Sequence, residues 1–185
     1  MQDGYPTIVG LGGAGAGFLE SYTQRQSVNC IHINNDVDTV TRWRDGALNC
    51  FSLLVDKGET IISAADKELL RSLFRRSPLI VVVVGLGGSC NSYLSCISEL
   101  LGHQMHNALF VAYVPFAFEK SRRAKAWSLM ESSGLPLVPV DLQGLLERNS
   151  SEKLSLDEVF EKVHRITSSV IDEIFLSVHP DSVGC

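Results

Sequence analysis

The sequence predicts an α/β fold: a Rossmann-like parallel sheet of six strands with helices on both faces, ending in a long helix. Two observations lead to this class. Short apolar runs alternate with longer amphipathic stretches along the chain, which is typical of a parallel sheet wrapped by helices. One of the runs, "LIVVVVG", has no polar alternation, and such a run is typical of a central strand that is buried on both faces.

The apolar runs and amphipathic stretches give the expected elements in order. We expect strands at residues 7–9, 28–33, 51–55, 79–84, 109–114 and 137–140. We expect helices at residues 15–23, 38–43, 60–74, 92–103, 121–131 and 155–176. In the last of these, apolar residues recur at spacings of three and four, which predicts one amphipathic helix longer than the rest. We expect a single domain over residues 1–178 and a flexible tail over residues 179–185.

Composition and charge exclude several classes of protein. A chain of 185 residues that is 45% hydrophobic and 20% charged can bury one core, and a net charge of −5 argues against a broad nucleic-acid-binding face. The start of the chain has no signal-peptide pattern, and the longest apolar run is too short to span a bilayer, so we expect a cytoplasmic protein without a membrane partner. The five cysteines have no CxxC or zinc spacing, so we expect no metal site.

Glycine is concentrated where the first strand is expected to meet its helix. Five of the eight residues from Gly10 to Gly17 are glycine, in "VGLGGAGAG". Glycines at such a junction let backbone N–H groups approach a phosphate, and the following helix directs its N-terminus at the anion. A purely structural role in close helix packing stays open. So does a dinucleotide-binding enzyme, because Gly10-x-Gly12-x-x-Gly15 fits that pattern, with Asp36 as a possible ribose acid.

A second stretch has the same organisation. In "VVVVGLGGSCNSYLS", residues 81–95, a buried strand is followed by Gly85, Gly87 and Gly88 and then by a helix start that carries Ser and Asn. Two such junctions on different strands predict a nucleotide held between two helix N-termini, which a simple dinucleotide fold does not require. We expect the two junctions to lie side by side at one end of the sheet. A third stretch, "YVPFAFEKSRRA", places an acid and a basic cluster after another strand.

These stretches, in this order, resemble the N-terminal nucleotide-binding half of the tubulin/FtsZ family. The resemblance covers nearly the whole chain and includes "IVGLGGAGAG", "INNDVDTV", "VVVVGLGGSCNSYLS", "VPFAFEKSRR" and "LVPVDLQGLLE". It implies that the long last helix is the central helix of that family. It also implies that the ligand is GTP or GDP, with Mg²⁺ accompanying GTP.

The resemblance implies a role for each matched residue. Backbone N–H groups on one side of the phosphates would come from Gly10, Gly12, Gly13, Ala14 and Gly15. Groups on the other side would come from Gly87, Gly88, Ser89, Asn91 and Ser92. The loop after the second strand would contribute Asn34 and Asp36. Glu119 would accept hydrogen bonds from the ribose, Arg123 would face the terminal phosphate, and Phe160 would pack on guanine. Two alternatives that involve no ligand stay open: a helix-surface ion pair between Glu119 and Arg123, and a purely core position for Phe160.

Several positions depart from the family. His164 and Arg165 stand where FtsZ has the Asn-Asp pair that reads guanine, and a cationic Arg cannot accept hydrogen bonds from the base. We therefore expect weak discrimination between bases. Gly17 stands where the family has an Asn near the base, and Tyr93 stands where a Gly is expected. The loop that senses the terminal phosphate has no counterpart here.

The sequence ends at Cys185, about where the second domain of the family begins. That domain supplies the acidic residues that hydrolyse nucleotide on the neighbouring subunit. The resemblance therefore implies no catalytic residue in this chain, little hydrolysis by the chain alone, and a part in filament assembly or cell division. The expected partner is a full-length FtsZ-like protein or a second copy of the chain. The alternative is a pseudo-GTPase interaction module that binds no nucleotide.

Overall fold

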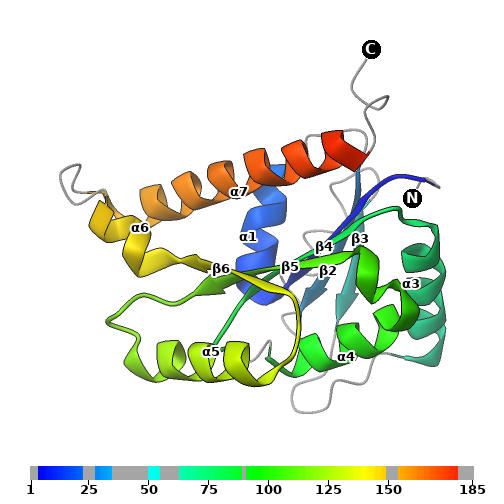
Figure 1. Ribbon diagram of the computed structural model, residues 1–185, viewed down its shortest axis with the longest axis horizontal. Helices are drawn as coiled ribbons and strands as arrows, with labels where there is room; N and C mark the ends of the chain where they lie inside the picture. The colour runs from blue at the N-terminus through cyan, green and yellow to red at the C-terminus, as the bar shows by residue number, and fades with distance from the viewer. Residues whose placement is uncertain are drawn as a thin grey trace.

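The computed structural model describes residues 4–22, 28–34, 50–54, 63–88, 91–148 and 154–178 (Figure 1). In chain order the elements are β1 (Thr7–Leu11), α1 (Gly12–Tyr22), β2 (Asn29–Asn34), β3 (Cys50–Leu54), α3 (Ala64–Arg76), β4 (Ile80–Gly85), α4 (Asn91–Leu101), the 3-10 helix η1 (Gly102–Asn107), β5 (Ala108–Val114), α5 (Lys120–Ser132), β6 (Leu137–Asp141), α6 (Leu142–Arg148) and α7 (Leu156–Val178). Among these helices, none is long and apolar enough to cross a membrane.

The six strands form one sheet in the order β3-β2-β1-β4-β5-β6, and every neighbouring pair is parallel. This confirms the predicted fold class and places β4 at the centre of the sheet. From β1 the chain moves outward through β2 and β3. It then returns to β4, on the other side of β1, and moves outward through β5 and β6. The chain therefore changes direction between β1 and β4, which makes this the switch point of the sheet.

Helices cover both faces of the sheet (Figure 1). Ile80, Val82 and Val84 of β4 pack in a core with residues of α3, α4 and α5. Val81 and Val83 of the same strand pack in the opposite core with residues of α1 and α7. All five side chains are fully buried, and burial of each contributes about 1.5–3 kcal/mol. This two-sided burial explains why the strand shows no polar alternation.

The long helix expected at the end of the chain is α7, which has 23 residues. It begins at a capping box, in which the Ser155 N–H donates to Glu158 Oε2 at 2.7 Å and the Glu158 N–H donates to Ser155 Oγ at 3.3 Å. The bond from the Ser155 backbone lowers the pKa of Glu158 below its ordinary value. One face of α7, including Val159, Val163 and Ile171, is buried against the sheet and α1.

Some predicted boundaries were wrong. The helix expected at 60–74 is α3, whose first residue is Ala64, because Ser63 Oγ accepts a hydrogen bond from the Asp66 N–H at 3.1 Å and caps it there. Residues 142–148 form α6, where no helix was expected. The helix expected at 38–43 and the tail at 179–185 lie outside the described residues, so the proposed domain boundary stays a prediction.

Candidate functional site

The two glycine-rich junctions leave the sheet from neighbouring strands. β1 ends at Leu11, directly before α1, and β4 ends at Gly85, shortly before α4. Leu11 pairs in register with Val84, and a Cβ on Gly85 would lie 2.8 Å from the Ala14 Cβ. The expectation that the junctions lie side by side is therefore confirmed. They lie at the carboxyl end of the sheet at its switch point, where open α/β sheets bind their ligands.

Two of the glycines are explained by packing alone. Gly10 lies inside β1 and Gly15 lies in the first turn of α1, and their backbones touch. A Cβ on Gly10 would lie 2.6 Å from the Gly15 carbonyl oxygen, and a Cβ on Gly15 would lie 2.6 Å from the Gly10 Cα. Any side chain at either position would push α1 away from the sheet. For this pair the structural alternative, close helix packing, is sufficient.

Two other glycines are required by the backbone. Gly12 has φ 65° and Gly87 has φ 80°, which is the left-handed region that favours glycine. A Cβ on Gly87 would also overlap the Arg122 carbonyl group. The second junction is thus packed against the first turn of α5, so the segment after β5 belongs to the same site.

Neither close packing nor a left-handed backbone conformation explains the glycines at Gly13 and Gly88. Neither has a left-handed φ, and a Cβ on either would meet no described atom within 4 Å. Gly13 is the second residue of α1, and the first N–H groups of a helix have no partner within it. Among the described atoms, one glycine of this kind at each junction thus has free space beside its backbone, which is what a phosphate needs in order to approach N–H groups.

Within α1 and α4, electrostatic attraction for an anion comes from backbone groups. Neither α1 nor α4 contains a Lys or Arg, but both begin here, and a helix N-terminus carries a partial positive charge. Asn91 and Ser92 are the first two residues of α4. Asn34 is buried at the carboxyl end of β2, beside β1. Two further candidate residues, Asp36 and Ser89, lie outside the described residues.

Arg123 is held by protein groups. Its Nη1 donates to the Pro115 carbonyl at 2.6 Å and to Asp141 Oδ1 at 2.7 Å, and its Nη2 donates to Asp141 Oδ2 at 3.0 Å. These bonds lower the pKa of Asp141 below its ordinary value and raise that of Arg123. The guanidinium also lies 5.7 Å from the centre of the Trp127 ring. Arg123 therefore fastens α5 to the ends of β5 and β6.

The structure does not form the ion pair weighed for Glu119 and Arg123. Glu119 instead accepts a hydrogen bond from Nη1 of Arg122, the residue before Arg123, at 2.9 Å. The Arg123 side chain turns toward Asp141. The Glu119 side chain remains 26% exposed. A carboxylate has further lone pairs, so Glu119 can still accept from a ligand.

Aromatic rings connect the turn after β5 with α7. Phe116 is buried and stacks on Phe118, with ring centres 5.3 Å apart and planes at 8°. Phe160 meets Phe116 edge-on at 5.8 Å and lies 6.2 Å from the His164 ring. Phe160 is half-buried against the core, so its packing role is present whether or not it also contacts a ligand. Phe118 was not among the predicted site residues; its signal in the sequence is a second aromatic residue directly before Glu119.

His164 fills the space between α1 and α7. Its ring stacks on Tyr113 at 5.9 Å and meets Phe18 edge-on at 5.9 Å. Its Cε1 would lie 3.3 Å from a Cβ on Gly17, so a larger residue at that position would require a small shift of the His164 ring. Its Nε2 is buried, with no hydrogen-bond partner among the residues that the structure describes. Burial lowers the pKa of His164 below its ordinary value of 6.5.

This environment predicts a pH-dependent stability. Between the lowered pKa of folded His164 and 6.5, the unfolded chain binds a proton at this residue that the folded chain does not, so the free energy of unfolding should fall as the pH decreases through this window. In a His164→Phe variant this loss should be smaller. Urea unfolding of both proteins at pH 7.5 and pH 5.5 measures the difference. Equal losses in the two proteins would assign the titration to other groups.

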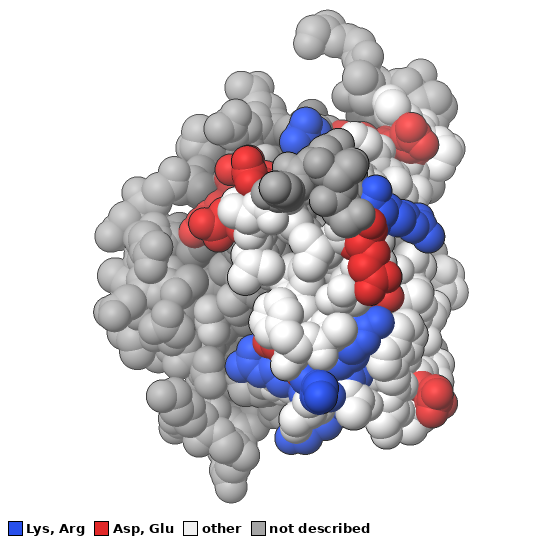
Figure 2. All heavy atoms as spheres, turned by 90° about the vertical axis from the view of Figure 1, so that its left-hand side faces the viewer, with Lys and Arg blue, Asp and Glu red and all other residues white. Residues whose placement is uncertain are grey.

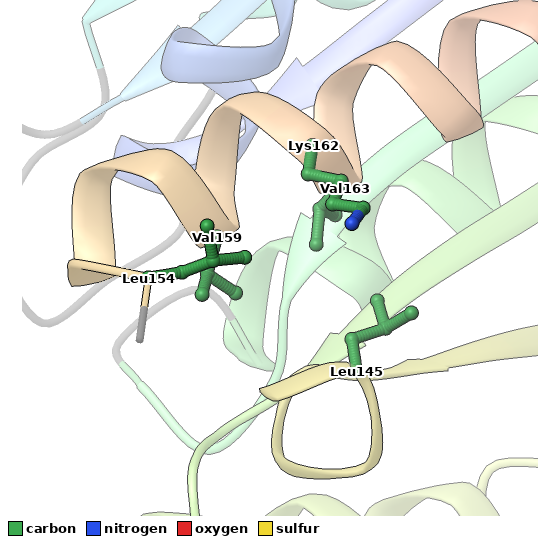
Figure 3. Close-up of a pocket in the computed structure, with 5 residues that line it drawn as sticks. All are labelled: Leu145, Leu154, Val159, Lys162 and Val163. Carbon is green, nitrogen blue, oxygen red and sulfur yellow. The ribbon is translucent and has the colours of Figure 1, made fainter. Parts of the chain in front are cut away.

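A separate pocket lies between α6 and α7. It is lined by Leu145, Leu154, Val159, Lys162 and Val163 (Figure 3). Its lining is mostly aliphatic, with Lys162 as the one charged residue. It is not the nucleotide site suggested by the junctions.

Figure 2 shows the side of the molecule at which β5 and β6 end. Lys and Arg side chains gather in its lower part, over α5, and uncharged residues cover the middle. The basic residues of α5 are Lys120, Arg122, Arg123 and Lys125. An uncharged surface thus adjoins a basic one at the end of the sheet that carries the site.

Two solved structures share the arrangement of this chain, although no protein-family model and no curated protein sequence matches it. The W319Y mutant of FtsZ from M. jannaschii has a TM-score of 0.72 and 20% sequence identity, covering 99% of this chain and 59% of its own. CetZ1 from Haloferax volcanii, a GDP-bound monomer, has a TM-score of 0.61 and 16% identity, covering 94% of this chain and 60% of its own. The chain therefore has the α/β fold of tubulin/FtsZ-type proteins, over a part of their length.

Proposed function

We propose that this protein binds a guanine nucleotide, GTP or GDP, at the carboxyl end of β1 and β4. The observation that carries the proposal is the pair of open glycines, Gly13 and Gly88, one at each junction of the switch point. Neither the backbone conformation nor the packing of the described residues requires glycine there. A ligand that approaches the backbone closely accounts for the presence of glycine at both positions. The GDP-bound state of CetZ1 supports the choice of a guanine nucleotide.

In this proposal the phosphates lie between the N-termini of α1 and α4. N–H groups of the first turn of α1 donate to phosphate oxygens, and the Gly88 backbone approaches them from the second junction. Glu119 accepts hydrogen bonds from the ribose while it keeps its bond to Arg122. Arg123, through Pro115 and Asp141, keeps the segment after β5 in place for this contact.

Nucleotide content is the direct test. The purified protein is denatured, and the supernatant is separated by chromatography to identify released nucleotides. The protein freed of nucleotide is then titrated with GDP. We expect guanine nucleotide in the supernatant or saturable binding in the titration. An empty supernatant together with no binding of GDP would contradict the proposal.

Replacement of Gly13 by alanine separates binding from folding. The new methyl group enters the open space beside the α1 backbone and should hinder a phosphate, so we expect GDP affinity to fall by about tenfold, the equivalent of one lost hydrogen bond. Calorimetric titration measures this change. Gly144→Ala in α6 is the matched control, because a Cβ there makes only ordinary contacts, the nearest at 3.4 Å from Asp141. Unchanged affinity in Gly13→Ala would show that the open glycine does not serve a ligand.

One observation favours a second candidate function, an interaction module that binds no nucleotide. The guanidinium of Arg123, which the family resemblance directs to the terminal phosphate, is bound by Asp141 on both of its terminal nitrogens. The same GDP titration separates the two functions. For the nucleotide-binding protein we propose, from the likeness to FtsZ and CetZ1, a part in filament assembly, with a second copy or an FtsZ-like protein as partner.

A further inference from the structure

We propose that Phe118 is the platform on which the nucleobase stacks; this inference rests on the proposed function. Phe118 is 64% exposed, more than any other large hydrophobic residue of the described ranges. It lies in the connection between β5 and α5, at the end of the sheet that carries the two junctions. An exposed aromatic ring is a suitable surface for a planar heterocycle, since the two stack face to face.

Among the described residues, Phe116 covers one face of the Phe118 ring. Phe116 lies parallel to it at 5.3 Å and is itself only 2% exposed. Phe160 meets Phe116 edge-on and supports it from α7. Because Phe118 is backed by this pair and still largely exposed, its outer face is the one open to a ligand.

The backbone around Phe118 is fixed by three separate hydrogen bonds. The Glu119 N–H donates to the Phe116 carbonyl at 3.0 Å, which closes a turn with Phe118 near its tip. The Ala117 N–H donates to Gln143 Oε1 of α6 at 3.0 Å. Arg123 donates to the Pro115 carbonyl before the turn. The backbone of the turn is therefore held in position before any ligand arrives, which reduces the entropy lost on binding.

The position of the turn fits a nucleotide. β5 is the neighbour of β4, and the second junction touches the first turn of α5 through Gly87 and the Arg122 carbonyl. Glu119, which is proposed to bind the ribose, directly follows Phe118 in the chain. The ribose lies between the phosphates and the base in a nucleotide, so phosphates at the junctions and a ribose at Glu119 leave the base near Phe118.

Phe160, which the family resemblance pairs with guanine, is less available for this contact. Its ring is half-buried and lies between Phe116 and His164, whose rings are 5.8 and 6.2 Å away. The two aromatic residues can be separated by experiment, because Phe160 belongs to the core of α7 and Phe118 does not.

The test is calorimetric titration of the protein with GDP and, separately, with inorganic pyrophosphate, which has no base. We expect Phe118→Leu to weaken GDP binding by about 10- to 100-fold, the range measured for loss of one base–aromatic stack, and to leave pyrophosphate binding within about twofold. Phe118→Tyr, which keeps the ring, should restore GDP affinity. Phe160→Leu, checked for folding by circular dichroism, should weaken GDP binding less than Phe118→Leu does, because it removes only the support of Phe116. A larger loss in Phe160→Leu would assign the stack to Phe160 and overturn this inference.

Leu69→Ala is the control for loss of an exposed apolar side chain, because Leu69 is 39% exposed in α3 and takes no part in the contacts described for the turn; GDP affinity should be unchanged in it. GDP binding that is unchanged in Phe118→Leu would overturn this inference and leave the proposed function standing. An equal loss of GDP and pyrophosphate would also overturn it, by showing that the turn and not the ring is needed. A wild-type protein that binds neither probe would overturn the inference together with the proposed function.

Discussion

Replacement of Gly15 by alanine is expected to destabilise the protein by about 3 kcal/mol, a large part of the 5–15 kcal/mol typical of a folded domain. The added Cβ would lie 2.6 Å from the Gly10 Cα and 2.9 Å from the Val83 carbonyl oxygen. Both atoms belong to the backbones of β1 and β4, the two central strands, which cannot move without disturbing their own hydrogen bonds. The helix α1 must therefore shift away from the sheet and lose buried contacts.

Gly13→Ala provides the matched control, two residues earlier in the same helix. No described atom lies within 4 Å of a Cβ at Gly13, so this change should stabilise the helix by about 0.5–1 kcal/mol. Urea unfolding followed by circular dichroism measures both variants. Opposite signs for the two substitutions are the expected result. A Gly15→Ala variant as stable as the wild type would show that the contact between α1 and β1 is looser than the structure indicates.

The fold could be predicted well because its signals are local. A strand buried on both faces needs an uninterrupted apolar run, and "LIVVVVG" supplies it at the strand that lies in the centre. The spacing of apolar residues in the sequence predicted the helix α7 in the same way. The helix α6 was missed because seven residues complete fewer than two helical turns, too few for a period to appear, and because Gly144 interrupts it.

The candidate site could be predicted in position but not in the role of each residue. All glycines of the first junction look alike in the sequence, although Gly10 and Gly15 are required by each other and Gly13 is open to solvent. These differences depend on which atoms lie opposite each residue after folding. The partner of Arg123 was missed for the same reason, since Asp141 lies 18 residues further along and is brought near only by the pairing of β5 with β6.

The second large effect is expected at this pair. Arg123→Ala should destabilise the protein by about 2 kcal/mol, because it removes charge-assisted hydrogen bonds to Asp141 and to the Pro115 carbonyl from a side chain that is only 22% exposed. Asp141→Asn should cost less, since the carboxyl group is 37% exposed and its amide replacement still accepts one bond. A double-mutant cycle by urea unfolding gives the interaction between the two residues. A coupling near zero would contradict the fastening role of Arg123.

Acid titration and nucleotide binding test this role independently. The pKa of folded Asp141 lies below its ordinary value of 3.8, so the stabilisation is present above that pH and is lost as the pH falls below it. Arg123→Ala should reduce this acid-dependent loss.

Because Asp141 already holds both terminal nitrogens of Arg123, Arg123→Ala should weaken GDP and GTP binding in parallel, through displacement of the turn that carries Phe118 and Glu119. A selective loss of GTP affinity would instead place Arg123 at the terminal phosphate, as the family resemblance implies.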